Sequence, residues 1–419
     1  MQNLLYLLLA YLPFQIALNP AEGFDLASIR VIVPLFFLTW LALGLKRKRL
    51  SFPESPVIGF LLIFLFLATF SIFFAQNLSW SLRKLAFIFS LAPLFFVIPT
   101  YLDNQQKIRA ALKFLVYGSA AMAMVAIFQF LLQFAIGLDN AQTIWSKYLI
   151  APFLGNTFSQ AVISYPSWLV NISGKTYLRA FGLFPDPHML AFYLGMTLPW
   201  AAALYFETRK KPFLVASFLI LIADLLTFSR GGYLGLFGGL IISLMFIGKI
   251  KIKHILIAAS ALILTAMMFL FSPIGGRLIS TFDVSEGSNL GRIAIWRQTF
   301  DIIANNPLGV GIGNYSLAVN PIANYRDPIY AHSLYLDIAS ELGLISLLVW
   351  LLLIAGAVYG FYKKGLHDNL YLAGIVSLGI YSFHSLVENA LFSIQVFTLL
   401  IIILAISACQ DKAFAKQSC

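Results

Sequence analysis

The sequence predicts an all-α, polytopic membrane protein, and three observations lead to that fold class. Of its 419 residues, 60% are apolar and only 11% are charged, whereas a soluble domain carries about a quarter charged residues. The mean hydropathy over the whole chain is +0.87. A water-soluble globule of this composition would leave too much apolar surface exposed to water. About twelve apolar runs follow one another, most close to the ~20 residues that cross a bilayer as a helix. Soluble enzymes, secreted disulfide scaffolds and disordered chains are therefore excluded.

The predicted spans form a single integral membrane domain over residues 1–419. Each run is bounded by charged residues or by clusters of Gly and Pro, and prolines interrupt three of them. The first run lacks the basic start and the small-residue cleavage site of a signal peptide, so we expect it to be retained. The twelve runs cover residues 3–19, 28–45, 56–75, 84–100, 110–136, 187–206, 213–228, 233–248, 255–272, 332–358, 370–387 and 389–408.

Basic clusters predict the orientation of these spans, because Lys and Arg gather in cytoplasmic loops. The strongest cluster is Lys46 to Arg49, after the second run. Alternation then places the basic residues at 209–211, 249–253, 363–364 and 412–416 on the same side, with both termini cytoplasmic. This topology accounts for much of the net charge of +11, so we expect membrane lipids and not nucleic acid as partners.

Two long connections fall on the outer side, at 137–186 and 273–331. Both are rich in aromatic and turn residues, which favours ordered segments over tethers. In the second, Ile293, Trp296, Phe300 and Ile303 recur at helical spacing and predict an interfacial helix near 288–304. Arg292 and Arg297 lie five residues apart on it, so their side chains diverge by about 140°.

Several cationic residues lie on the outer side, where orientation does not require them. Each of them can be a long side chain reaching the interface from a helix end. Arg30, the Arg83–Lys84 pair and Arg230, however, sit at the outer ends of different spans, and converging guanidinium groups suit phosphate. Arg230 is the sharpest of these candidates because it lies in a break of only a few residues, although it can also be an ordinary helix-end arginine. The outer cations are Arg30, Arg83, Lys84, Lys147, Lys175, Arg179, Arg230, Arg277, Arg292, Arg297 and Arg326.

Histidines and acids supply the remaining candidates. His332 opens the tenth run and can accept a proton from a hydroxyl, or can be an amphipathic residue at headgroup level. Glu341 would lie about 13 Å deeper on the same helix, as a functional acid or as a hydrogen-bond acceptor joining helices. His188 begins the sixth run. His384 and Glu388, four residues apart on one helix face, could pair.

Motifs for metals and cofactors are missing from the sequence. There is no His-Glu-x-x-His, no glycine-rich phosphate loop and no Asp-rich cluster with ligand spacing. Cys409 and Cys419 lie at the C-terminal end in a spacing that suits neither a metal site nor a disulfide framework. We therefore expect neither a metal nor a cofactor.

Four stretches within 175–350 resemble the O-antigen ligase and polymerase superfamily of bacterial membrane glycosyltransferases. They are Arg179–His188, Ser229–Gly232, the segment from Gly291 to Gly311, and His332–Gly343. Each motif is weak alone, but their order and spacing are specific. Two positions depart from the family's usual pattern: Asp186-Pro187-His188 replaces Asn-Pro-Asn, and Ser333 stands where Asn is frequent.

The resemblance implies a GT-C-like enzyme of the inner membrane, with its active site on the periplasmic face. Members transfer a glycan from an undecaprenyl-diphosphate carrier to an acceptor, here lipid A-core, a glycan or a protein. By similarity Arg230 and Arg292 would hold the diphosphate, and His332 would activate the acceptor hydroxyl, without a metal. Further diphosphate contacts would come from Arg30, Arg83, Lys84, Arg179 and Arg297, while Glu341, His188 and His384 would be structural or acceptor-side residues.

Three alternatives remain open at this stage. A polymerase of the same superfamily needs the same donor-side arginines. A polysaccharide transporter or flippase would carry ionisable pairs near the bilayer midplane in both halves. A non-catalytic scaffold of an envelope complex would not need arginines and a histidine at one site.

Overall fold

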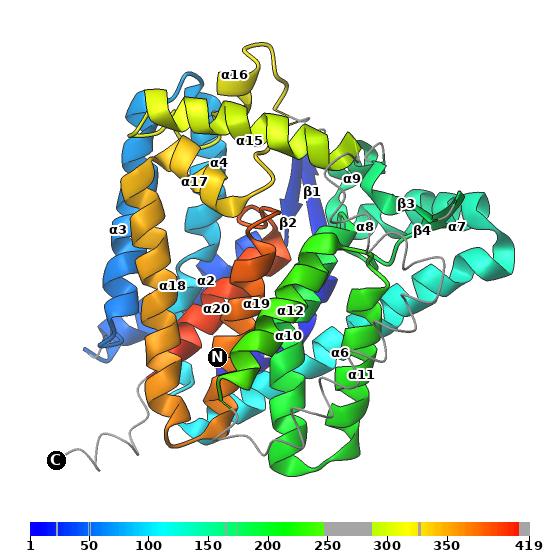
Figure 1. The fold of residues 1–419 in the computed structure, drawn as a ribbon. Helices are drawn as coiled ribbons and strands as arrows, with labels where there is room; N and C mark the ends of the chain where they lie inside the picture. The colour runs from blue at the N-terminus through cyan, green and yellow to red at the C-terminus, as the bar shows by residue number, and fades with distance from the viewer. Residues whose placement is uncertain are drawn as a thin grey trace.

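The computed structural model describes most of the chain as one mostly helical body (Figure 1). The described residues are 1–21, 24–48, 50, 52–163, 166–172, 174–246, 287–325 and 328–409. The predicted span 255–272 and the outer cations Arg277 and Arg326 lie outside them, as do the basic residues at 249–253 and 412–416.

Six helical segments in the described residues are long and apolar enough to cross a membrane. They confirm the class of fold, but not the predicted count of about twelve spans. The six are α2 (Ile29–Lys46), α3 (Pro56–Phe70) with its 3₁₀ extension (Ser71–Phe74), α4 (Leu78–Leu91) continued by α5 (Leu94–Tyr101), α6 (Gln105–Ile136), α10 (Pro187–Thr208) and α18 (Leu344–Gly365).

Shorter apolar helices coincide with five other predicted runs. They are α1 (Gln2–Tyr11), α11 (Lys211–Leu225), α12 (Arg230–Leu244), α19 (Leu372–His384) and α20 (Ile394–Ala408). α20 is buried almost throughout and forms the centre of the bundle. Around it, α3 packs on α18, α10 on α11, and the glycine-rich α12 on α19, as Figure 1 shows.

Two short hairpins correct the all-α prediction. β1 (Ala17–Ala21) pairs antiparallel with β2 (Phe24–Ala27), and β3 (Leu169–Ile172) with β4 (Lys175–Leu178). The predicted run 3–19 is therefore wrong in its second half: α1 gives way to a 3₁₀ turn at Pro13, and the chain then extends into β1. The strand contains Pro20, which cannot donate a backbone hydrogen bond to a continuing helix.

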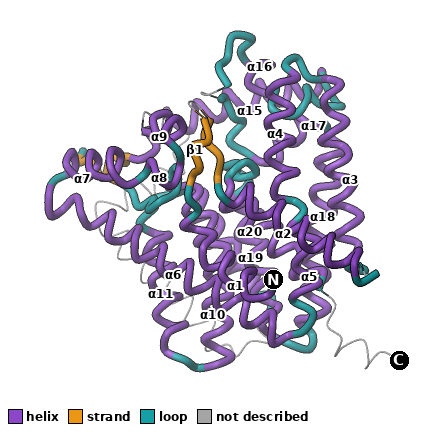
Figure 2. Tube along the Cα trace, turned by 180° about the vertical axis from the view of Figure 1, so that it is seen from behind, coloured by secondary structure: helices purple, strands orange, loops and turns teal. Residues whose placement is uncertain are grey.

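The connection 137–186 is ordered, as its composition predicts. It contains α7 (Leu138–Ile144), α8 (Ala151–Leu154) and α9 (Asn156–Ile163) besides the second hairpin, and it lies to one side of the bundle in Figure 2. Two buried amides of α6 anchor its end: Gln133 Oε1 accepts from the Leu178 N–H at 2.8 Å, and Gln129 Oε1 from the Phe181 N–H at 2.9 Å. Buried backbone N–H groups need such partners.

The predicted interfacial helix is present as α15 (Gly287–Asn305), which runs across one end of the bundle (Figure 1). Its apolar stripe does not all face outward: Ile303 is buried, and the Trp296 indole donates to the Ala331 carbonyl, while Phe300 is 59% exposed. The stripe therefore packs partly on protein. After α15 the chain turns through three glycines with positive φ into α16 (Tyr315–Val319).

The predicted run 332–358 is wrong as one helix. Gly343, at φ +87°, separates α17 (Leu334–Leu342) from α18. A side chain at this position would also meet the Pro307 and Leu308 carbonyls at 2.8 Å. Glu341 therefore lies in a short helix and not deep in a transmembrane span. This helix is at the end of the bundle that α15 crosses, which we call the α15 end.

Gly311 offers a test of how tightly this end is packed. Its φ is +91°, and a Cβ there would lie 2.6 Å from the Ala75 Cα, so we expect Gly311→Ala to destabilise the fold by ~2 kcal/mol. Gly59 of α3 has open space around it, and Gly59→Ala is the control. Thermal unfolding in detergent should show a lower Tm for Gly311→Ala alone; an equal Tm for both variants would contradict the packing.

Candidate active site

A buried carboxylate, Glu388, lies at the centre of a polar cluster at the α15 end. It sits in the loop between α19 and α20, and its Oε1 accepts a hydrogen bond from Arg292 Nη2 at 2.6 Å. Its Oε2 lies 3.5 Å from His332 Nδ1, and Oε1 lies 3.8 Å from His188 Nδ1. Three segments distant in sequence thus meet on one side chain. The predicted pairing of Glu388 with His384 gives way to this arrangement, because α19 ends at His384.

The cluster favours the ionised form of Glu388. Burial by itself raises the pKa of this carboxyl, but the charge and hydrogen bonding of His188, His332 and Arg292 outweigh it and lower the pKa to about 2. The carboxylate is therefore anionic at any physiological pH. One carboxylate anion can hold both a guanidinium and an imidazole N–H.

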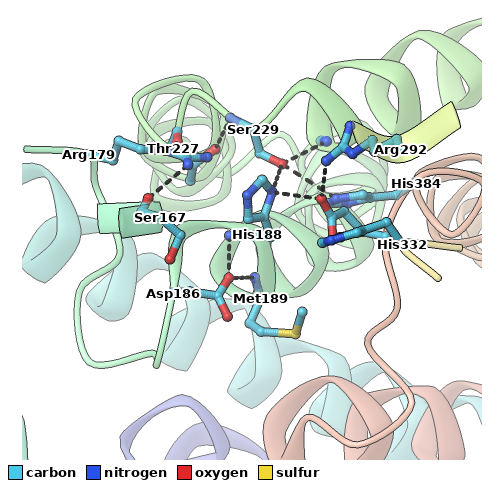
Figure 3. A network of polar contacts seen from close by, with 12 residues as sticks. Ser167, Arg179, Asp186, His188, Met189, Thr227, Ser229, Arg292, His332 and His384 are labelled. Carbon is cyan, nitrogen blue, oxygen red and sulfur yellow. Dashed lines mark hydrogen bonds and ion pairs between the residues drawn. The ribbon is translucent and has the colours of Figure 1, made fainter. Parts of the chain in front are cut away.

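Ser229 joins the cluster from the start of α12. Its hydroxyl caps the helix by accepting from the Gly232 N–H at 3.1 Å, and it lies 2.9 Å from His188 Nδ1 and 3.5 Å from His384 Nε2. The His384 ring stacks on Phe192 with their centroids 3.5 Å apart. Figure 3 shows Ser229, His188, His384, Arg292 and His332 converging from different elements.

His332 is held in a strained backbone conformation. Its φ is +51°, in the left-handed region, which costs of order 1–3 kcal/mol for a non-glycine residue. Neighbouring contacts enforce it: the Ala331 N–H donates to Asp337 Oδ1 at 2.9 Å, and the Leu334 N–H donates to the Ser385 carbonyl at 3.0 Å. The His332 side chain remains 40% exposed. The protein thus presents one imidazole edge to Glu388 and leaves much of the ring open.

Asp337 connects His332 to the Glu388 loop. Its Oδ2 accepts from the Asn389 amide at 2.6 Å, next to Glu388. Burial raises the pKa of Asp337 to about 6 against the opposing hydrogen bonds. Because Asp337 contacts the backbone beside His332 and the residue beside Glu388, it positions the cluster without entering it.

Glu341 belongs to a second group of charges. Its carboxylate accepts from the Gly313 N–H at 2.8 Å and from the Tyr315 N–H at 3.4 Å, which fits the hydrogen-bond acceptor role. Burial raises its pKa to about 7, and the nearby Lys84 opposes this shift. Glu341 therefore supports the glycine turn and lies outside the histidine cluster.

The cations of α2 and α4 pack on aromatic rings. Lys84 Nζ lies 3.5 Å from the Phe392 ring centroid, and the Arg83 guanidinium lies 5.0 Å from that of Tyr325. Arg30 donates to Ser90 Oγ at 3.1 Å and lies over Phe87. Such contacts hold a cation without neutralising it. Phe392 lies in the same loop as Glu388, four residues later.

The Arg179 side chain is buried, in contrast to the diphosphate contact that the resemblance implies. It is only 5% exposed, with Nε donating to the Thr227 carbonyl at 2.6 Å and Nη1 to the Ser167 carbonyl at 2.8 Å. It thereby holds the turn that leads into Ser229 and α12, as Figure 3 shows. We assign it a positioning role, because a buried side chain bonded to backbone carbonyls cannot readily bind substrate.

The remaining candidates lie near α12 and on α15. Arg230 is the first residue of α12, beside Ser229, and is partly buried. The next residue, Gly231, abuts the His384 ring. Arg297 is exposed on α15, so it diverges from Arg292 as the helical spacing predicts. Arg230 and Arg292 therefore both border the cluster, whereas Arg297 does not.

Three residues of this site are not singled out as a group by the sequence. Glu388 is expected there only as a possible partner of His384, while Ser229 and Asp337 are only parts of longer motifs. A signal for Glu388 existed in its rarity, since it is an acid between two long apolar runs. Ser229 and Asp337 had no comparable signal, because hydrogen bonds between distant segments leave no mark in sequence. Within the described residues no group of three or more His, Cys, Asp or Glu side chains could hold a metal ion.

Comparison with protein families gives a match at this site. Residues 215–351 match the model of the O-antigen ligase family. The predicted resemblance to the O-antigen ligase and polymerase superfamily is confirmed. The matched segment carries Arg230, Arg292 and His332, whereas Glu388 and Arg179 lie outside it. The family is one of glycosyltransferase-like enzymes that use a lipid-linked glycan donor and an acceptor in the membrane. No curated protein matches the chain.

The ion pairs of Glu388 predict a pH-dependent stability. Because its pKa falls from 4.5 to about 2 on folding, the pairs contribute fully above pH 4.5 and are lost as the pH falls toward 2. We expect Glu388→Gln to lower the Tm at pH 7, and the difference from the wild type to shrink at pH 3–4. The exposed Glu54 supplies the control Glu54→Gln. A Tm difference for Glu388→Gln that is the same at both pH values would contradict the assignment.

Proposed function

We propose that this protein transfers a glycan from an undecaprenyl-diphosphate carrier to an acceptor hydroxyl at the periplasmic face of the bacterial inner membrane, as an O-antigen ligase. The observation that carries the proposal is the contact of Glu388 with both Arg292 and His332. This contact supports the proposal, because a guanidinium that can bind an anion and an imidazole that can act as a base share one carboxylate. The cluster lies at the α15 end, opposite the turn between α10 and α11 that holds basic residues 209–211 (Figure 1).

His332 is the candidate base. With Nδ1–H directed at Glu388 Oε2, the ring presents Nε2 to an acceptor hydroxyl, and the carboxylate stabilises the imidazolium that forms. The hydroxyl oxygen forms a bond to the anomeric carbon while the bond from that carbon to the diphosphate oxygen breaks. The proton passes to Nε2, and the electron pair of the broken bond leaves on undecaprenyl diphosphate.

Arg292 and Arg230 are the candidate diphosphate ligands. Glu388 is bonded to one terminal nitrogen of Arg292, and a guanidinium has five N–H donors, so the others can bind phosphate oxygens. Arginine in a partly water-excluded site can stabilise the charge that develops on the leaving diphosphate. Arg30, Arg83 and Lys84 add positive potential from α2 and α4, and the predicted acceptor-side residues His188 and His384 line the cluster through Ser229.

The proposal is tested by incubating purified protein with a lipid-linked glycan donor and separate acceptors: lipid A-core, a second lipid-linked glycan, and a peptide. Transfer to lipid A-core supports a ligase, and lengthening of the lipid-linked glycan supports a polymerase of the same superfamily. Movement of the donor across a vesicle membrane with no transfer to any acceptor would overturn the proposal in favour of a flippase.

A substitution at His332 separates its base function from its backbone role. Asparagine tolerates positive φ but cannot accept the proton, so we expect His332→Asn to lower kcat by about 10²–10⁴-fold with little change in the KM for donor. His367→Asn, in the turn after α18, is the control and should keep wild-type rates. The measurement is initial transfer rate against donor concentration; an unchanged kcat in His332→Asn would contradict the role.

Metal removal supplies a separate test. Because arginines are proposed to neutralise the leaving diphosphate, we expect transfer by chelator-washed protein in EDTA to match transfer in the presence of Mg²⁺ or Mn²⁺. A loss of activity in EDTA that is restored by one of these ions would contradict the arginine-based mechanism.

A further inference from the structure

A cavity of about 510 Å³ opens at the α15 end, apart from the histidine cluster. One wall comes from the 3₁₀ turn and connection before α4, through Phe74 and Gln76. The other comes from α15 and from the turn that follows it toward α16. The cavity therefore lies between two segments that are more than 200 residues apart in sequence.

The lining is rich in uncharged hydrogen-bonding groups. Gln76, Gln298, Asn305 and Asn306 bring side-chain amides to it, and Asp301 brings one carboxylate. Within the described chain, no hydrogen bond engages the side chains of Gln76, Asp301 or Asn305. Amides both donate and accept, and a carboxylate accepts from two donors at once. This lining matches a ligand with several hydroxyl groups.

Phe74 adds an apolar surface to the same cavity. Its ring is 39% exposed, although Phe70 packs against it at 5.8 Å between centroids. The face of an aromatic ring carries partial negative charge and attracts the polarised C–H groups on one face of a pyranose. An exposed ring beside amides suits a sugar, which has both an apolar face and a polar rim.

The charge of the lining excludes the other ligands of this membrane surface. None of the described residues that line the cavity is Lys or Arg, so a phosphate or a lipid headgroup anion would find no counter-ion and would be repelled by Asp301. The polar lining equally disfavours an acyl chain. A neutral, polyhydroxylated ligand remains.

The cavity is linked to the candidate active site by α15 itself. Gln298, Asp301 and Asn305 follow at helical spacing and share one side of α15 with Ile302. Asp301 lies nine residues after Arg292, or about 13 Å along the helix axis. Because the two side chains point to different sides of α15, a ligand that reaches both must follow the helix over several sugar units.

We propose that this cavity is a glycan subsite that binds sugar units remote from the reacting bond. The proposal rests on the proposed glycosyl transfer and adds to it a substrate class, an extended neutral glycan. Its chemistry suits the glycan of either the donor or the acceptor, and the experiment distinguishes these two sources.

The test uses the double variant Asp301→Ala/Asn305→Ala in the full-length protein. Asp139→Ala/Asn140→Ala, on the exposed surface of α7, is the matched control. Two donors are compared, one carrying a single repeat unit and one carrying many. Each donor is assayed with two acceptors, one with a full-length core and one with a truncated core. Loss of two or three hydrogen bonds at about 1 kcal/mol each predicts a KM about 30- to 150-fold higher, with kcat on the one-repeat donor unchanged.

If the double variant raises the KM only for the long donor, the subsite binds the donor glycan. If it raises the KM only for the long-core acceptor, the subsite binds the acceptor glycan. Unchanged KM values for all substrates would overturn the subsite while leaving the proposed transfer intact. If the wild-type protein transfers nothing, binding of the free repeat-unit oligosaccharide, followed by saturation-transfer NMR, tests the cavity on its own. Equal signals from wild type and the double variant would then overturn it.

Discussion

The arrangement of this site depends on the contacts that the buried carboxylate of Glu388 makes with its neighbours. A desolvated carboxylate is costly unless cations and hydrogen bonds surround it. Here Arg292 from α15 and His332 from the loop before α17 supply them, and His188 from the start of α10 lies 3.8 Å from the same carboxylate. Because the charge has to be compensated, the positions of these elements relative to one another are constrained. The crosswise α15 is thereby tied to the upright helices beneath it.

The same constraint explains the strain at His332. A left-handed histidine persists only where its surroundings determine it more strongly than its own preference does. Asp337 does so from two sides, through the Ala331 N–H and the Asn389 amide, and the indole of Trp296 binds the Ala331 carbonyl. Contacts within the protein therefore orient the imidazole, and no ligand is needed to position it.

Local patterns in the sequence were sufficient for much of the fold. Apolar runs predicted α2, α3 and α10 to within a few residues, although a proline lies inside both α2 and α10. The periodicity of Trp296 and Ile303 predicted α15. The errors occurred where one residue overrides a pattern. Gly343 ends α17 inside an apolar run, and Pro13 with Pro20 turns the first run into a strand. Hydropathy is averaged over many residues, so it does not detect a single glycine or proline that ends a helix inside an apolar run.

The sequence by itself indicated the membrane class of this protein and its resemblance to the O-antigen ligase superfamily, and it singled out Arg230, Arg292 and His332 as candidates, because composition, run length and motif spacing are local properties. Only the tertiary structure decided which groups lie together. It brought Glu388 to Arg292 and His332, separated Glu341 from them, turned Arg179 toward backbone carbonyls, and opened a cavity between Gln76 and Asp301. These are contacts between segments far apart in the chain, which arise from helix packing and from the need to compensate buried charge.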